Sequence, residues 1–330
     1  MAGILVLGEL NGGKLQASTS ELLVAGRKLA EALGEEVAVA IPGSGLNGVA
    51  DSAIAQGADK VYLVEDPLLA ETQIDAQLAA FEHVCRQVEP SVVLISRTQS
   101  GRDIGPRLAF RLGVGVAQDC IDIEIDSSTK RVVATRPVYG GNALSKVTFP
   151  ENNPQVAVIR GKVFEPTSPD SSRSGEVVTI QPNLDPSVIK ARLVESVQSE
   201  SEGVRLEDAT VVISGGRGLG GPEPFESLEE LAKLLGGAVG ASRAACDAGW
   251  LDHSYQVGLT GKTITPDLYI TVGISGASQH MAGCSGAKQL VAINKDAEAN
   301  IFKEASFGVV GDWSAVLPAF IETVRELVKS

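Results

Sequence analysis

The first hundred residues alternate between short apolar runs and longer segments with helical periodicity. The apolar runs, rich in β-branched residues, cover 4–7, 37–40, 61–64 and 92–95, and the clearest helical segments are 21–33 and 74–88. Continuous apolar strands separated by helices are typical of a parallel sheet with helices on both faces. The pattern predicts a doubly wound parallel sheet, in which ligands usually bind beyond the carboxyl ends of the strands.

The rhythm changes between about 121 and 163. Segments that alternate or are rich in β-formers occupy 121–125, 131–135 and 156–159, and turn-forming residues separate them at 140–142 and 151–154. We expect antiparallel hairpins in this region, appended to the first sheet.

A polar segment rich in proline and serine follows at 165–185 and offers little apolar surface for burial. We predict a linker there, and hence two domains, 1–185 and 186–330. Strand and helix patterns then alternate again, with strands at 210–214, 268–272, 290–294 and 307–311 and a last helix at 314–329. This alternation predicts a second, smaller α/β sheet.

Composition narrows the classes of function. The 330 residues are 44% apolar, which is enough for two domains with separate cores. With 28 basic and 41 acidic residues the net charge is −13, which disfavours binding to nucleic acid or anionic lipid. The four cysteines have neither zinc-site nor disulfide spacing, so we expect reduced thiols. We see no secretion signal or membrane span and expect a cytoplasmic protein, or an organelle matrix protein if a transit peptide was removed.

A glycine-rich turn with the pattern G-x-G-x-x-G spans 216–221, after a strand pattern at 211–215 and before a helical one at 225–235. This context suits a dinucleotide fingerprint, in which backbone N–H groups approach a pyrophosphate and Arg217 neutralises it. A plain strand-to-helix turn is the alternative. An NAD site also needs an acidic residue at the end of the next strand, and 238–242 contains none, so NAD is disfavoured.

Three later segments each gather small residues around one polar group. They are 240–249 with Arg243, 256–262 with Thr260 and 275–280 with His280. Glycine and alanine admit a ligand close to the backbone, while a cation, a hydroxyl and an imidazole supply directed contacts to a flat, electron-accepting ligand. Structural alternatives exist for each group. Arg243 can pair with Asp247, Thr260 can cap a loop, and His280 can be a satisfied structural histidine.

The three segments, in this order and with these gaps, resemble the FAD-binding domain of the electron transfer flavoprotein alpha subunit, and the similarity runs from about 211 to about 313. The resemblance implies a Rossmann-like, DHS-like domain that binds one FAD non-covalently, and a heterodimer with a beta subunit. Residues 97–109 and 139–143 match the amino-terminal domain of the family. In the family that domain contacts the beta subunit and does not hold the flavin.

The same resemblance implies how the ring of the flavin is held. Arg243 lies over the isoalloxazine and raises its potential, with Ser242 in contact. The Thr260 hydroxyl bonds to the N5 edge, and His280, charged or neutral, lies near the O2 and N1 edge, where a donor stabilises the anionic reduced ring. Many family members have a glutamine before this threonine, where the present chain has Leu259, so one polar contact differs.

Further contacts are implied for the rest of the cofactor. Arg217 and the backbone of 275–279 approach the phosphates, and Asn294, Asp312 and Trp313 lie near the adenosine. As simple helix caps at the ends of their strands, Asp296 and Asp312 are equally natural. The full set of predicted cofactor-binding residues is Arg217, Ser242, Arg243, Gln256, Val257, Gly258, Leu259, Thr260, Ser275, Gly276, Ala277, Ser278, Gln279, His280, Asn294, Asp312 and Trp313. We predict neither catalytic nor metal-binding residues.

The implied function is that of an electron carrier and not of an enzyme. Electrons come from an acyl-CoA dehydrogenase or another flavin dehydrogenase, as in fatty acid β-oxidation, and pass to a quinone reductase or another acceptor. Three alternatives stay open. They are an electron-bifurcating form with a second FAD in the beta subunit and NADH as donor, an NAD-dependent oxidoreductase, and a nucleotide-binding subunit with no redox role.

Overall fold

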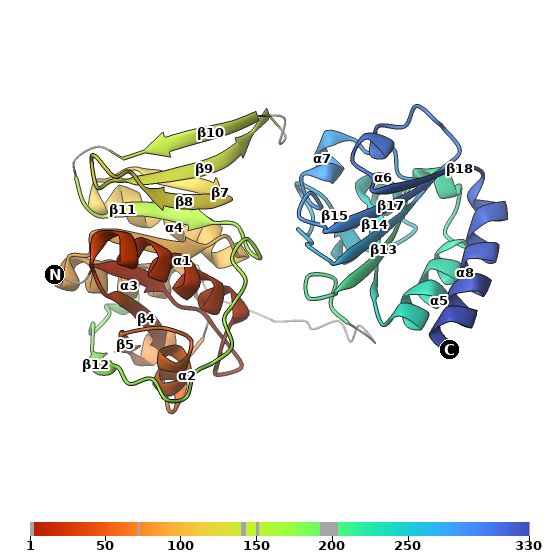
Figure 1. Ribbon diagram of the computed structural model, residues 1–330. Coiled ribbons are helices and arrows are strands. Elements are labelled where there is room, and N and C mark those ends of the chain that lie inside the picture. Colours follow the sequence, from red (N-terminus) through yellow and green to blue (C-terminus); the bar gives the residue numbers. More distant parts are fainter. Residues whose placement is uncertain (1–2, 72, 140–142, 150–151, 192–203, 330) are drawn as a thin grey trace. The chain divides into compact units, whose positions relative to one another are not determined.

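The computed structural model describes residues 3–71, 73–139, 143–149, 152–191 and 204–329 of the chain (Figure 1). The chain forms two compact units, residues 1–196 and 197–330. Each unit contains a parallel sheet with helices packed against it. The predicted α/β class with two domains is confirmed.

A seven-stranded parallel sheet forms the centre of the first unit, in the order β12-β5-β4-β1-β6-β11-β7. Its strands are β1 (Ile4–Leu7), β4 (Val37–Gly43), β5 (Lys60–Glu65), β6 (Val92–Ser96), β7 (Val116–Cys120), β11 (Gln155–Ile159) and β12 (Glu176–Ile180). The chain runs from β1 to β4 on one side and later to β6 on the other, so the carboxyl ends of β1 and β6 form the switch point of the sheet. The predicted doubly wound sheet is confirmed.

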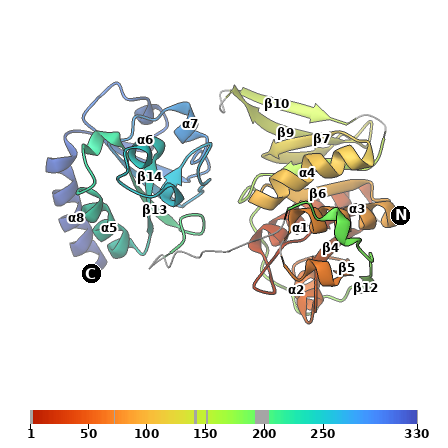
Figure 2. The same ribbon diagram turned by 180° about the vertical axis from the view of Figure 1, so that it is seen from behind.

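Helices cover both faces of this sheet because successive strand residues point to opposite sides. The helices are α1 (Ala17–Leu33), α2 (Val49–Ala55), α3 (Ile74–Val88) and α4 (Gln99–Leu112). Ile4 and Val6 pack with α1 and α2, whereas Leu5 and Leu7 pack with α3 and α4. Figure 2 gives the view from the side of α3 and α4. The helix predicted at 74–88 has the predicted bounds.

Three antiparallel strands pack on the α1 side of the first sheet. They are β8 (Asp122–Ile125), β9 (Val132–Val138) and β10 (Ala143–Thr148). Antiparallel pairing was predicted here, although the turn residues 140–142 and 151 lie outside the described residues. The prediction was wrong for 156–159, which enters the parallel sheet as β11 between β6 and β7. All five residues of β11 are buried, and a strand covered on both faces belongs inside a parallel sheet.

The segment 165–185, predicted as a linker, is in part a strand of the first unit. Its β12 pairs in parallel with β5 at the edge of the sheet, and the Leu184 amide donates to the Asp66 carboxylate at 2.8 Å. Among the residues of β12 only Ile180 is buried, so the composition of the segment stays polar although it supplies backbone partners to β5. β12 accordingly belongs to the first compact unit, 1–196, and the domain bounds 1–185 and 186–330 stay a prediction.

A six-stranded parallel sheet forms the second unit, in the order β15-β14-β13-β16-β17-β18. Its strands are β13 (Val211–Gly215), β14 (Ala238–Ser242), β15 (Gln256–Val257), β16 (Leu268–Val272), β17 (Gln289–Asn294) and β18 (Phe307–Val310). The helices α5 (Phe225–Leu235) and α8 (Trp313–Lys329) lie side by side on one face (Figure 1). The carboxyl ends of β13 and β16 form the switch point, because the chain order reverses between them.

Candidate cofactor-binding pocket

A cavity of about 640 Å³ lies at the carboxyl edge of the second sheet, where loops that follow β13, β14, β16 and β17 meet. A doubly wound sheet offers its ligand site at this edge. The predicted cofactor-binding residues that line the cavity are Arg217, Ser242, Arg243, Gln256, Val257, Gly258, Leu259, Thr260, Ser275, Ala277, Gln279, His280 and Asn294. The fold therefore brings residues of the three small-residue segments, 240–249, 256–262 and 275–280, to one cavity.

Sequence reasoning missed several other lining residues. They are Ala244, Asp247, Gly273, Ile274, Asp296 and Ala299, whereas Gly218, which also lines the cavity, belongs to the glycine-rich turn that was predicted to approach a pyrophosphate. Most are small or apolar and offer a ligand only backbone atoms or a surface, so nothing in their side chains distinguishes them from core residues. Asp247 was considered only as a partner for Arg243, and Asp296 only as a helix cap at the end of its strand.

A second hollow, of about 450 Å³, is lined by Glu226, Glu229, Glu230, Lys233 and Leu234. All five residues belong to α5. A hollow formed by one exposed helix face lacks the convergent walls of a small-molecule site. We therefore consider the cavity at the strand ends to be the functional candidate.

The glycine-rich turn joins the loops after β13 and β16. The Gly218 amide donates to the Gly273 carbonyl at 3.0 Å, and a β-carbon at Gly216 would overlap that same carbonyl oxygen. The turn continues as the short 3₁₀ helix η4 (Arg217–Leu219), and α5 begins only at Phe225. These glycines thus allow two loops to pack closely, as in the plain-turn alternative, while their approach to a pyrophosphate stays a prediction.

Arg243 begins the short helix α6 (Arg243–Asp247), directly after β14. Its side chain is 67% exposed, and its Nε lies 3.3 Å from Asp247 Oδ2. The ion pair considered as the structural alternative is therefore present. An exposed pair of this kind contributes about 0–1 kcal/mol, so turning the guanidinium from Asp247 to a ligand costs little. The ion pair with Asp247 therefore does not prevent Arg243 from contacting a ligand.

The loop at 256–262 is held at two points. Gln256 is 5% exposed and donates from Nε2 to Thr260 Oγ1 at 3.0 Å. The Leu259 amide donates to the Gln279 carbonyl at 2.7 Å, which ties the loop to the segment before His280. Because Thr260 accepts the bond from Gln256, its own O–H remains able to donate to an acceptor in the cavity. Leu259 presents an apolar side chain that is 56% exposed.

His280 lies on the short helix α7 (Ser278–Met281) and is 7% exposed. Burial lowers its pKa to about 4, because desolvation disfavours the charged imidazolium, so the ring is neutral at pH 7. Its Nε2 lies 2.8 Å from the Tyr269 hydroxyl. Its Nδ1 is buried and has no hydrogen-bond partner among the described residues. The sequence left the charge of this histidine open, and the structure favours the neutral form.

Asn294 ties the end of β17 to the loop after β16. Its Nδ2 donates to the Ile274 carbonyl at 2.9 Å, and its Oδ1 accepts from the Asp296 amide at 3.0 Å. Both bonds orient the side chain toward the protein, so this residue shapes the cavity wall. Its predicted contact with adenosine stays a prediction.

Some predicted residues do not line the cavity: Gly276, Ser278, Asp312 and Trp313. Asp312 acts as the helix cap that was its alternative role, with Oδ1 accepting from the Ser314 amide at 3.0 Å and from the Ser314 hydroxyl at 2.7 Å. Trp313 packs against the core beneath α5 and α8. Gly276 has φ 79° and lies against the Ile301 backbone. Cofactor contacts of these residues stay predictions.

Comparison with known proteins shows to which family the chain belongs. The electron transfer flavoprotein domain matches residues 4–185, and the electron transfer flavoprotein FAD-binding domain matches residues 205–285. The electron transfer flavoprotein subunit alpha of Megasphaera elsdenii is 42% identical over 326 residues, which cover 98% of this chain and 96% of that protein. The chain belongs to the electron transfer flavoprotein subunit alpha family.

Other relatives of this family cover the chain as fully. The electron transfer flavoprotein subunit alpha of Bacillus subtilis is 42% identical over 325 residues, and 98% of each protein is covered. Protein FixB of Azotobacter vinelandii is 36% identical over 322 residues, which cover 96% of this chain and 89% of that protein. The resemblance stated from the three sequence segments is therefore confirmed along the whole chain, with the electron-transport role of the family.

The matched FAD-binding domain contains the glycine-rich turn, Arg243, Thr260 and His280, and it ends at 285, before Asn294. Within the part of the chain that the structure describes, no helix has the length and apolar character needed to cross a bilayer. The same described residues include no group of three or more histidine, cysteine or acidic side chains arranged to hold a metal ion.

Proposed function

We propose that this alpha-family chain binds one FAD non-covalently in the cavity of its second unit and relays electrons as part of a heterodimer with a beta subunit. The observation that carries the proposal is a pair of unsatisfied polar atoms in the cavity wall. Ser242 Oγ and His280 Nδ1 are both buried and lack a hydrogen-bond partner among the described residues. A buried polar group without a partner costs about 1–3 kcal/mol, and a bound ligand that pairs with both removes that cost.

The other lining groups fit a flavin as well. Arg243 supplies a permanent positive charge on a weakly held side chain, Thr260 has a free O–H proton, and His280 supplies an uncharged N–H. Bound FAD supplies the electron-accepting chemistry. The protein contributes a cation and two neutral donors, which favour a ligand that gains negative charge, without any need for a general acid or base. We accordingly regard the chain as a carrier subunit and not as an enzyme.

The finer functional roles rest on the family. We propose that electrons arrive from an acyl-CoA dehydrogenase or another flavin dehydrogenase and pass to a quinone reductase or another acceptor. An electron-bifurcating heterodimer, with a second FAD in the beta subunit and NADH as donor, is the alternative within the family. The number of flavins per heterodimer separates the two forms, because the first needs one and the second needs two.

An NAD-dependent oxidoreductase is supported less well. The strand β14 ends at Ser242 without the acidic residue that a ribose requires, and Gly216 packs against the loop at Gly273.

The proposal is tested by adding FAD to the purified chain, alone and with its beta subunit, and recording the visible spectrum and the quenching of flavin fluorescence. We expect stoichiometric uptake and a yellow complex. A preparation that stays colourless, or that takes up NADH and not FAD, contradicts the proposal.

A further inference from the structure

Tyr269 stands directly behind the cavity wall. It lies on β16 and is fully buried, at 0% exposure. Its hydroxyl is 2.8 Å from His280 Nε2, and the two rings lie at 21° to one another with centroids 6.1 Å apart. In the sequence, a tyrosine within an otherwise mostly apolar strand looks like a core residue. Its polar end, however, contacts the one imidazole that lines the cavity.

The direction of this hydrogen bond decides which nitrogen of His280 carries the proton. A neutral imidazole has one N–H donor and one bare nitrogen acceptor. The phenol O–H is more acidic than an imidazole N–H, and so is the better donor of the two. Burial raises the pKa of Tyr269 well above its ordinary value, so its proton stays in place. Ser214 lowers the pKa of Tyr269, which is the direction given by a hydroxyl that donates to the phenol oxygen and leaves the phenol proton free. Nε2 is then the acceptor of that proton, and the proton of the ring lies on Nδ1.

The Val257 backbone supports the same assignment. Its carbonyl favours a proton on the imidazole, and a carbonyl oxygen can only accept. Because the phenol already faces Nε2, the nitrogen left to carry a proton is Nδ1. Nδ1 has no hydrogen-bond partner among the described residues. The N–H of Nδ1 is therefore available to a ligand.

We propose that Tyr269 is a positioning residue: its hydroxyl donates to Nε2 of His280, fixes the neutral tautomer with the proton on Nδ1, and so presents an N–H donor to the electron-rich edge of the ligand. The identity of that ligand as a flavin rests on the function proposed above. The opposite tautomer places a lone pair at Nδ1, which repels an acceptor that gains negative charge. Tyr269 thus selects the favourable one of two uncharged forms.

The tautomer can be measured on the full chain without FAD. The ¹⁵N chemical shifts of an imidazole distinguish a protonated from a bare nitrogen, and the chain has only three histidines. His83→Gln and His253→Gln variants assign the remaining signals to His280. We expect a protonated Nδ1 and a bare Nε2 in the wild type, and a mixture of tautomers in Tyr269→Phe. Tyr255→Phe, which removes a hydroxyl elsewhere in the same unit, serves as the control and should leave the wild-type signals unchanged. A protonated Nε2 in the wild type overturns the proposal.

A double-mutant cycle on FAD affinity tests whether Tyr269 acts through His280. We expect Tyr269→Phe to raise the Kd for FAD about tenfold, which corresponds to one hydrogen bond, and to have no effect in a His280→Ala background. An equal loss in both backgrounds indicates a merely structural role and overturns the proposal, as does an unchanged Kd in the single variant. If the wild-type chain takes up no FAD, the proposed function fails, while the tautomer measurement still decides the role of Tyr269.

Discussion

The two sheets have the same architecture at their switch points, yet among the described residues the second switch point leaves buried polar atoms without hydrogen-bond partners and the first does not. At the first switch point the Glu9 carboxylate accepts from the Thr98 hydroxyl at 2.6 Å, and burial raises its pKa. At the second, His280 Nδ1 and Ser242 Oγ are buried without partners among the described residues. At the first edge, side chains of the protein pair with one another. At the second edge, in our proposal, a ligand pairs with the polar atoms that the protein leaves without partners.

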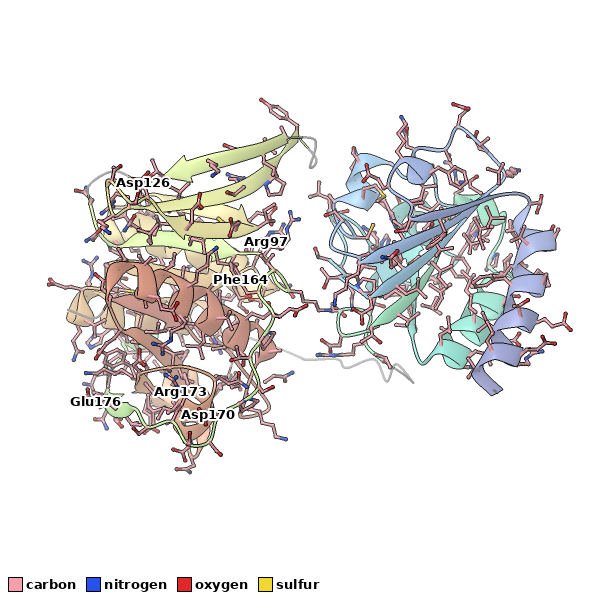
Figure 3. All side chains as sticks on the ribbon, viewed as in Figure 1. Arg97, Asp126, Phe164, Asp170, Arg173 and Glu176 are labelled. Carbon is pink, nitrogen blue, oxygen red and sulfur yellow. The ribbon has the colours of Figure 1, made fainter. Side chains whose placement is uncertain are left out.

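Charged side chains also have more partners near the first switch point than near the second. Near the first switch point, Asp119 forms an ion pair with Arg97 at 3.1 Å and accepts from two nitrogens of Arg160 at 2.9 and 2.8 Å. Figure 3 labels Arg97. In the second unit Arg243 has only a 3.3 Å contact with Asp247. The comparison teaches that strand order alone does not identify a binding site. The degree to which the protein satisfies its own polar groups distinguishes the two edges.

The largest expected effect comes from disturbing the packing of the loop after β16 at the second edge. Gly276 has φ 79°, and a β-carbon there would overlap the backbone of Ile301. Gly276→Ala should therefore lower the free energy of unfolding of the second unit by about 3 kcal/mol or more, through strain added to overlap. Gly220, with φ 86° and open space around it, is the matched control, and Gly220→Ala should cost about 1 kcal/mol. Urea titrations of both variants measure the difference, and equal costs contradict the packing argument.

The buried imidazole should make stability depend on pH. The pKa of His280 is about 4 in the folded chain, against 6.5 for an ordinary histidine exposed to water, so the unfolded chain binds the extra proton between these values. The contribution is present above pH 6.5 and is lost as the pH falls toward 4, by about 3 kcal/mol in total. His280→Gln should flatten this part of the curve in urea titrations at pH 7 and pH 4.5. His253→Gln, at a site 65% exposed, should leave it unchanged; equal slopes in all three proteins contradict the burial argument.

Removing the cation should change the flavin and not the fold. Arg243→Ala should lower the two-electron reduction potential of bound FAD by roughly 30–60 mV, which corresponds to about 1.5–3 kcal/mol for a charged hydrogen bond. Unfolding should be little affected, because the side chain is 67% exposed. Arg243→Lys keeps the charge and should recover part of the potential. A reductive titration with a reference dye measures all three proteins, and unchanged potentials exclude this role for Arg243.

The smallest effect is expected at the first switch point. Glu9→Gln keeps an acceptor for the Thr98 hydroxyl and removes a partly buried charge, so stability at pH 7 should change by less than about 1 kcal/mol. Since the pKa of Glu9 is raised in the folded chain, the wild type loses stability as the pH rises through that value, and the variant should not. FAD uptake should stay as in the wild type. Weakened FAD uptake in this variant contradicts the contrast between the two edges, because it shows that a residue at the first edge also supports FAD binding.

Local features of the sequence explain which elements could be predicted. The helices at 74–88 and 225–235 have the predicted bounds, because apolar periodicity and the left-handed residue after each helix lie within one segment. The strand pairing of β11 and β12 could not be predicted in this way. Pairing joins residues far apart in the chain, and the apolar run of β11 suits a hairpin or a sheet interior equally well without knowledge of its neighbours.

The residues of the candidate site likewise fall into those that local sequence indicates and those that depend on distant parts of the fold. Arg243, Thr260 and His280 stand out through small-residue segments and through resemblance, and the fold brings all three to one cavity. Tyr269 was missed because its hydroxyl meets His280 only across the fold. The Asp312 carboxylate caps α8, which was its alternative role, and its contact with the cofactor stays a prediction.

By itself, the sequence determined the α/β class, the alternation of strands and helices, the small-residue segments and the family, since these depend on residue type and spacing along the chain. Only the tertiary structure decided which strands pair, at which sheet edge polar atoms lack partners, and which charge state of His280 its burial favours. Those outcomes depend on burial and on hydrogen-bond partners from distant segments, and neither burial nor partnership exists until the chain has folded.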